Sequence, residues 1–136
     1  MGISARAGFV AALLLVGLPS MAVAQTAPIR KTILQQVVPG MPMGKSQEVR
    51  VITATFKPGE KTILHTHRFP VTYFVVEGTF RKEMEGSAPV IVKAGQAFVE
   101  PPNVKATLFN HSRTEPLRLV IFYASTPGAP FLDPVH

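Results

Sequence analysis

Two histidines in the middle of the chain, His65 and His67, have the residue type and the spacing of a metal-ligand pair. Imidazole nitrogens bind divalent transition metals, and side chains two positions apart in a β-strand project from the same face. Both rings would then reach one ion. Without a metal, the same pair would be the candidate general acid or base, because histidine titrates near neutral pH. The chain has no cysteine, which excludes a thiol mechanism.

Short strands separated by turns must position this pair. Apolar or alternating segments recur about every ten residues, and turns rich in glycine, proline and asparagine separate them. No segment after residue 25 keeps a 3.6-residue period. The pattern predicts an all-β sandwich or barrel of about eight or nine strands, with a proline-rich tail from residue 126 along its surface. The expected strands include residues 33–38, 48–56, 71–76, 79–84, 90–92, 96–100, 104–110 and 117–123.

The first 24 residues have the pattern of a secretory signal peptide. Arg6 precedes the apolar segment 9–18, and the small residues Ala22 and Ala24 stand before a cleavage point at Gln25. We therefore predict a signal peptide over 1–24, which forms an N-terminal signal helix, followed by one domain over 25–136. The apolar run is too short for a bilayer-spanning helix, so no membrane span should remain after cleavage. A cysteine-free exported domain suits the bacterial periplasm.

The charge of the predicted mature chain is positive but dispersed. Without Arg6 the chain keeps 13 basic and 8 acidic residues. The basic residues form no cluster and are not interleaved with aromatic residues, so we exclude nucleic acid as a partner.

Two spaced motifs give the chain a family resemblance. A glycine, five residues and H-x-H are followed by a second glycine, and a later glycine is followed by a proline and an asparagine. The residues in register are Gly59, His65, His67, Gly78, Gly95, Pro101 and Asn110. This arrangement resembles the cupins, and the resemblance implies a jelly-roll β-barrel, also called a double-stranded β-helix. Asn103 replaces a motif glycine, and asparagine tolerates the left-handed backbone expected there.

The metal ligands that the resemblance implies are only half present. Metal-binding cupins use three histidines and one glutamate, and here Val71 and Ala106 stand at the glutamate and third-histidine positions. We therefore expect a degenerate site in which His65 and His67 line the barrel interior, hydrogen-bonded through water or to a neighbouring tyrosine. The alternative is a divalent transition metal (Fe, Mn, Ni, Cu or Zn) with its shell completed from elsewhere. Glu100 is the nearest acid, and we expect it to be a solvated carboxylate at the barrel rim.

The interior should then form a mainly apolar pocket for a small molecule. With the two histidines, its expected ligand-binding residues are Tyr73, Phe98, Leu108 and Asn110. Three functions remain open, and no catalytic residue is assigned. They are an exported protein that binds a small organic ligand, a metal-dependent enzyme of the dioxygenase or isomerase kind, and a non-catalytic module that forms a homodimer.

Overall fold

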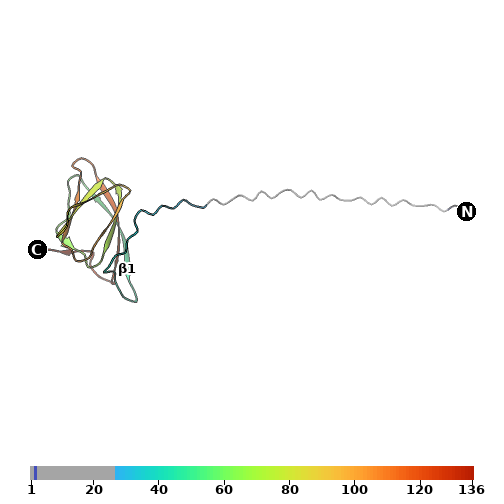
Figure 1. Ribbon diagram of the computed structural model, residues 1–136, viewed down its shortest axis with the longest axis horizontal. Coiled ribbons are helices and arrows are strands. Elements are labelled where there is room, and N and C mark those ends of the chain that lie inside the picture. Colours follow the sequence, from blue (N-terminus) through green and yellow to red (C-terminus); the bar gives the residue numbers. More distant parts are fainter. Residues whose placement is uncertain (1, 3–26) are drawn as a thin grey trace. The chain divides into compact units, whose positions relative to one another are not determined.

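The computed structural model describes residue 2 and residues 27–136, and residues 31–136 form one compact unit (Figure 1). The predicted signal peptide and its helix fall, apart from Gly2, outside the described residues. Within the described part of the chain, no helix is long and apolar enough to cross a membrane.

Within residues 27–136, nine strands form two antiparallel sheets that face each other across the core (Figure 1). One sheet has the order β1 (Glu48–Phe56), β8 (Leu117–Ser125), β3 (Val71–Glu77) and β6 (Ala97–Glu100). The other has the order β5 (Val90–Lys93), β4 (Thr79–Met84), β7 (Ala106–Asn110), β2 (His65–Thr66) and β9 (Asp133–Pro134). The all-β prediction is confirmed. The strand predicted over 33–38 is wrong, because this segment pairs with no sheet edge and residues 33–37 stay exposed.

The core lies between the sheets and follows the alternation of the strands. In β8 every second residue from Leu117 to Ser125 is buried, and in β1 the inward residues Ile52, Ala54 and Phe56 pack against the core. The outward residues of β1, such as Val51, are exposed. The strand predicted over 48–56 is therefore confirmed, with the same bounds.

Two tight turns depend on a left-handed backbone. Gly78 has φ of 82°, and a Cβ at this position would lie 2.4 Å from the carbonyl oxygen of Pro116, so only glycine fits. Asn103 has φ of 61°, as predicted from its place in the motif. Its N–H donates to the carbonyl of His67 at 2.7 Å, which ties this turn to the histidine pair.

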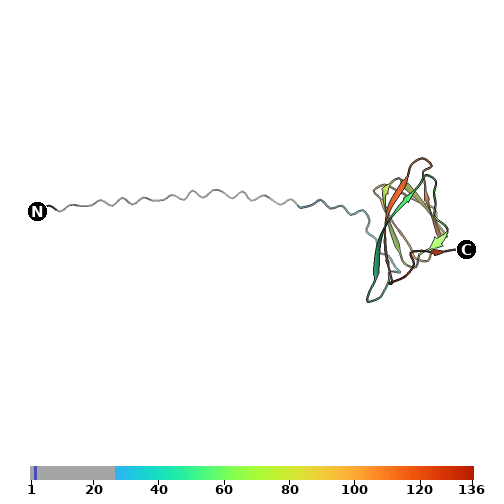
Figure 2. The same cartoon turned by 180° about the vertical axis from the view of Figure 1, so that it is seen from behind.

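The C-terminal strap, residues 126–136, runs beside β2. Its strand β9 pairs with β2 (Figure 2), and the N–H of Val135 donates to the carbonyl of Leu64 at 3.0 Å. Arg68 forms two hydrogen bonds with the carboxylate of Asp133, each 2.9 Å long. Phe131 packs partly buried against the core, so the expectation of a simple surface tail is wrong for this part of the strap.

Candidate metal centre

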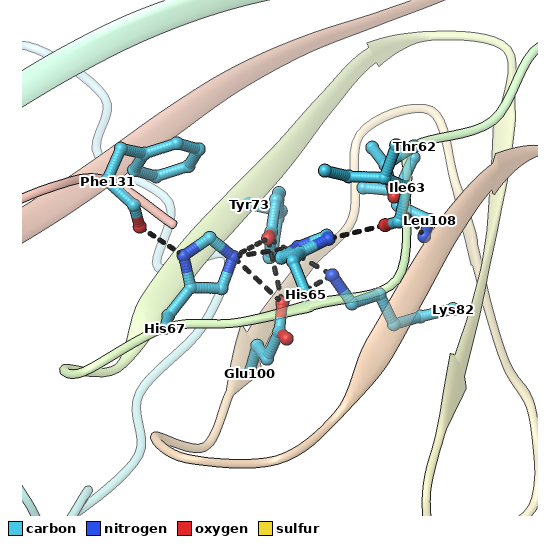
Figure 3. Close-up of polar contacts among 9 residues, drawn as sticks. All are labelled: Thr62, Ile63, His65, His67, Tyr73, Lys82, Glu100, Leu108 and Phe131. Carbon is cyan, nitrogen blue, oxygen red and sulfur yellow. Dashed lines mark hydrogen bonds and ion pairs between the residues drawn. The ribbon is translucent and has the colours of Figure 1, made fainter. Parts of the chain in front are cut away.

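His65 and His67 are both buried, with exposed fractions of 2% and 1%. His65 pairs across β2 and β7 with Ala106, and His67 follows directly after β2. Each ring is oriented by a backbone carbonyl that accepts from Nδ1. His65 Nδ1 donates to Ile63 at 2.7 Å, and His67 Nδ1 donates to Phe131 at 2.5 Å (Figure 3). Since a carbonyl only accepts, the proton of each neutral ring is on Nδ1.

The two Nε2 atoms face each other at 3.1 Å (Figure 3). With the proton on Nδ1, each Nε2 presents a lone pair, and neither has a hydrogen to donate to the other. Burial lowers the pKa of both rings, that of His67 to about 4, so both are neutral near pH 7. The arrangement brings two lone pairs together, as two ligands of one cation would be.

Glu100, the last residue of β6, completes the group. Its side chain has no exposed surface, and its Oε2 lies 3.8 Å from Nε2 of His67. The ligand atoms of the two histidines and this carboxylate all lie within 4.8 Å of one another. The expectation of a solvated rim carboxylate is wrong, because Glu100 faces inward directly across from Val71 in the β3–β6 register. The acid lost at the motif position is thus replaced by one on the neighbouring strand.

A buried lysine shares the site. Lys82 on β4 has no exposed surface, and its Nζ lies 2.5 Å from Glu100 Oε2. The same ammonium donates to the hydroxyl of Tyr73 at 3.2 Å, and that hydroxyl donates to Glu100 Oε2 at 2.8 Å. Burial lowers the pKa of Lys82 against the opposing effect of the Glu100 charge, and burial with the same charge raises the pKa of Tyr73 well above its usual range. Oε1 of Glu100 is buried and has no hydrogen-bond partner among the described residues.

The two histidine nitrogens have the spacing of ligands to one divalent transition metal, whereas Oε2 of Glu100, 3.8 Å from Nε2 of His67, lies farther out. Metal–nitrogen bonds of about 2.0–2.1 Å, at angles between about 90° and 109°, separate two ligand nitrogens by about 2.8–3.4 Å. The 3.1 Å between the two Nε2 atoms lies inside that range. Two imidazoles and one carboxylate form a recognised three-ligand set that leaves coordination positions open. The unpartnered Oε1 of Glu100 adds a free ligand atom.

A cavity of about 140 Å³ adjoins this polar cluster. Tyr73 and Leu108, both predicted for the pocket, line it together with the two histidines. Most of the remaining wall is aliphatic or aromatic, and Lys82 and Thr62 are polar members. The full lining is Ile52, Ala54, Phe56, Thr62, His65, His67, Tyr73, Lys82, Leu108, Ile121, Phe131 and Leu132.

Two residues predicted for the pocket lie elsewhere. Phe98 packs edge-on against Phe80, with ring centroids 6.2 Å apart, and lies outside the cavity lining. Asn110 is buried at the other end of β7, where its side-chain amide donates to the carbonyls of Lys57 and Glu115 at 3.1 and 2.8 Å. Its role there is to hold two loops together.

The sequence contained a signal for both residues that were missed. Lys82 is two positions from the buried Phe80, so strand alternation directs it inward. Glu100 is two positions from Phe98, which was already assigned to the interior. Both residues are charged, and charged side chains are seldom fully buried unless they are paired, so alternation alone is a weak signal for them.

Comparison with known proteins agrees with this geometry. The Cupin domain family model matches residues 52–123, just over half of the chain. No curated protein matches. A cupin-like protein from Thermotoga maritima is 25% identical, with a TM-score of 0.56 over 64% of each chain.

Two further solved structures share the fold at lower identity. A protein from Thermus thermophilus is 22% identical, with a TM-score of 0.52 over 64% of this chain and 82% of that one. A structure of DMSP lyases is 19% identical, with a TM-score of 0.55 over 65% of this chain and 44% of that one. The match spans less than two thirds of the Thermotoga and lyase chains.

Proposed function

Since the chain belongs to the cupin family, we propose that it binds one divalent transition metal through His65, His67 and Glu100 and presents it to a small, mainly apolar organic molecule in the barrel cavity. The observation that carries this proposal is the pair of Nε2 lone pairs held 3.1 Å apart, with each Nδ1 committed to a backbone carbonyl.

The protein's contribution is to orient and enclose the ligands. A bound ion supplies a Lewis acid with open coordination positions. The carbonyls of Ile63 and Phe131 fix the tautomer and direction of the two rings, as outer groups do in metal sites. The Tyr73 hydroxyl holds one oxygen of Glu100, and the apolar cavity wall keeps water from the polar cluster.

Metal titration of the chelator-stripped protein tests this function. We expect one cobalt(II) or zinc(II) ion per chain by isothermal titration calorimetry. His65→Ala and Glu100→Gln should each weaken binding by about 100-fold or more, because each removes one of three ligands. His111→Ala is the matched control, since His111 is exposed and outside the cluster. The proposal fails if the unaltered protein binds no ion, or if the ligand variants bind as well as the control.

A second candidate function follows from the Lys82–Glu100 ion pair. At 2.5 Å the ammonium already compensates the carboxylate, so the same cavity could bind a small organic ligand with no metal. The titration separates the two functions, because a metal-free binding protein would take up neither ion and His65→Ala would alter only its affinity for the organic ligand.

We also propose that the protein is exported to a bacterial periplasm. The support is the arrangement of Arg6, the apolar segment 9–18 and the small residues before Gln25, together with the absence of cysteine. Expression of the full chain in a bacterium, followed by N-terminal sequencing of the periplasmic fraction, should give a start near Gln25. An uncleaved product confined to the cytoplasm would contradict export.

A further inference from the structure

Lys82 lies between the polar cluster and the cavity. Its ammonium pairs with Glu100 (Figure 3). The same residue lines the cavity. We propose that Lys82 is a displaceable anion-binding group, which turns from Glu100 to the carboxylate of a small organic acid when a metal ion takes Glu100. This inference rests on the proposed metal site and adds the class of molecule that the cavity selects.

The charges of the buried cluster support this choice of ligand. Without metal, the positive charge of Lys82 balances the negative charge of Glu100, and both histidines are neutral. A divalent ion adds two positive charges that no other residue in the cavity lining can compensate, because the lining contains no acidic side chain. Uncompensated buried charge is costly. An anionic ligand reduces this cost, so metal loading should favour an acid over its neutral counterpart.

The cavity sets the size of the ligand. Its volume of about 140 Å³ is close to that of an apolar cavity that holds one benzene ring. Leu108, Ile121 and Phe56 supply apolar surface for such a group. The hydroxyl of Thr62, another polar group of the lining, already accepts from the N–H of Leu108 at 3.0 Å. A monocarboxylate with a ring-sized apolar part therefore matches the space and leaves Lys82 for its charged end.

Metal and acid should then bind cooperatively. The metal takes Glu100 from Lys82, and the acid takes Lys82 from Glu100, so each ligand frees the residue that the other one binds. The coupling free energy between two ligands is the same in both directions. We expect the metal to raise the affinity for the acid about tenfold, within the usual range of such couplings.

Calorimetric titration with benzoate and its neutral counterpart benzamide tests the inference. The unaltered protein should bind benzoate about tenfold more tightly when saturated with zinc than when stripped with chelator, whereas the affinity for benzamide should change less than about twofold. Lys82→Met should bind zinc at least about tenfold more tightly than the unaltered protein, because no ammonium then competes with the ion for the Glu100 carboxylate. The variant should also lose the zinc-dependent gain in affinity for benzoate. Lys105→Met, at an exposed lysine, is the control for charge removal and should behave as the unaltered protein.

The outcomes separate this inference from the metal site itself. Zinc binding without a gain for benzoate overturns the role of Lys82 and leaves the metal site intact. An equal gain in Lys82→Met also overturns it, because the anion would then be held by the ion alone. No zinc binding in any protein overturns both proposals. If Lys82→Met does not fold by circular dichroism, Lys82→Gln replaces it, with the same expected loss of the zinc-dependent gain for benzoate.

Discussion

The two sheets contribute opposite chemistry to the buried cluster. The four-stranded sheet supplies the acid and the phenol, Glu100 on β6 and Tyr73 on β3. The five-stranded sheet supplies the nitrogen groups, His65 on β2 and Lys82 on β4. Elsewhere the sheets meet through apolar side chains. The cluster is therefore the point where each sheet satisfies a buried polar group of the other, so loss of one side should leave the other unpaired.

Removal of the acid should therefore have the largest effect. In Glu100→Gln, the ammonium of Lys82 stays buried without its counter-ion, and breaking a buried pair in this way typically costs about 3–5 kcal/mol. We expect a loss of this size in the free energy of unfolding of the chelator-treated protein. Urea denaturation followed by far-UV circular dichroism measures it.

A double variant makes this comparison sharper. Glu100→Leu with Lys82→Met replaces both charges by apolar groups, and such replacements are often neutral or stabilising. The double variant should thus be more stable than either single variant. Additive losses would show that the two sheets do not depend on each other through this pair.

The second-largest effect should be a loss of folding stability at acidic pH, caused by the buried histidines of the cluster. Burial lowers the pKa of His67 from 6.5 to about 4, so between these pH values the unfolded chain binds a proton that the folded protein does not. The free energy of unfolding is therefore highest above pH 6.5, and it falls by about 3 kcal/mol as the pH drops to about 4. Burial lowers the pKa of His65 as well, which adds in the same direction.

Urea denaturation of the chelator-treated protein at several pH values from 7 to 4 checks this dependence. His67→Asn should have a shallower slope, because one of the two buried rings no longer titrates. The same slope in both proteins would show that carboxylates, and not the histidine pair, determine the acid sensitivity.

The fold and half of the site could be predicted from the sequence because they depend on local pattern. Alternation in 48–56 predicted a strand with the correct bounds, and the motif position of Asn103 predicted its left-handed backbone. Alternation also shows that Lys82 and Glu100 point inward. It does not show which residues lie opposite each other, since register depends on the pairing of distant strands. The replacement of the motif acid at Val71 by Glu100 depends on that register and became visible only in the fold.

The smallest effect should come from the strap, which lies at the weakest edge of the five-stranded sheet. The strand β9 contributes only two residues, whereas β1 at the edge of the other sheet pairs with β8 over nine. The exposed pair of Arg68 and Asp133 reinforces this short strand.

Exposed ion pairs contribute little to global stability, so Asp133→Asn should leave the urea midpoint unchanged. It should instead speed amide exchange at Val135, whose hydrogen bond to Leu64 closes the strap, because local opening needs less free energy than global unfolding. Glu77→Gln, which alters an exposed pair with Arg118 away from the strap, is the control. Unchanged exchange at Val135 in Asp133→Asn would show that Phe131, held by His67 and packed on the core, fixes the strap without the ion pair.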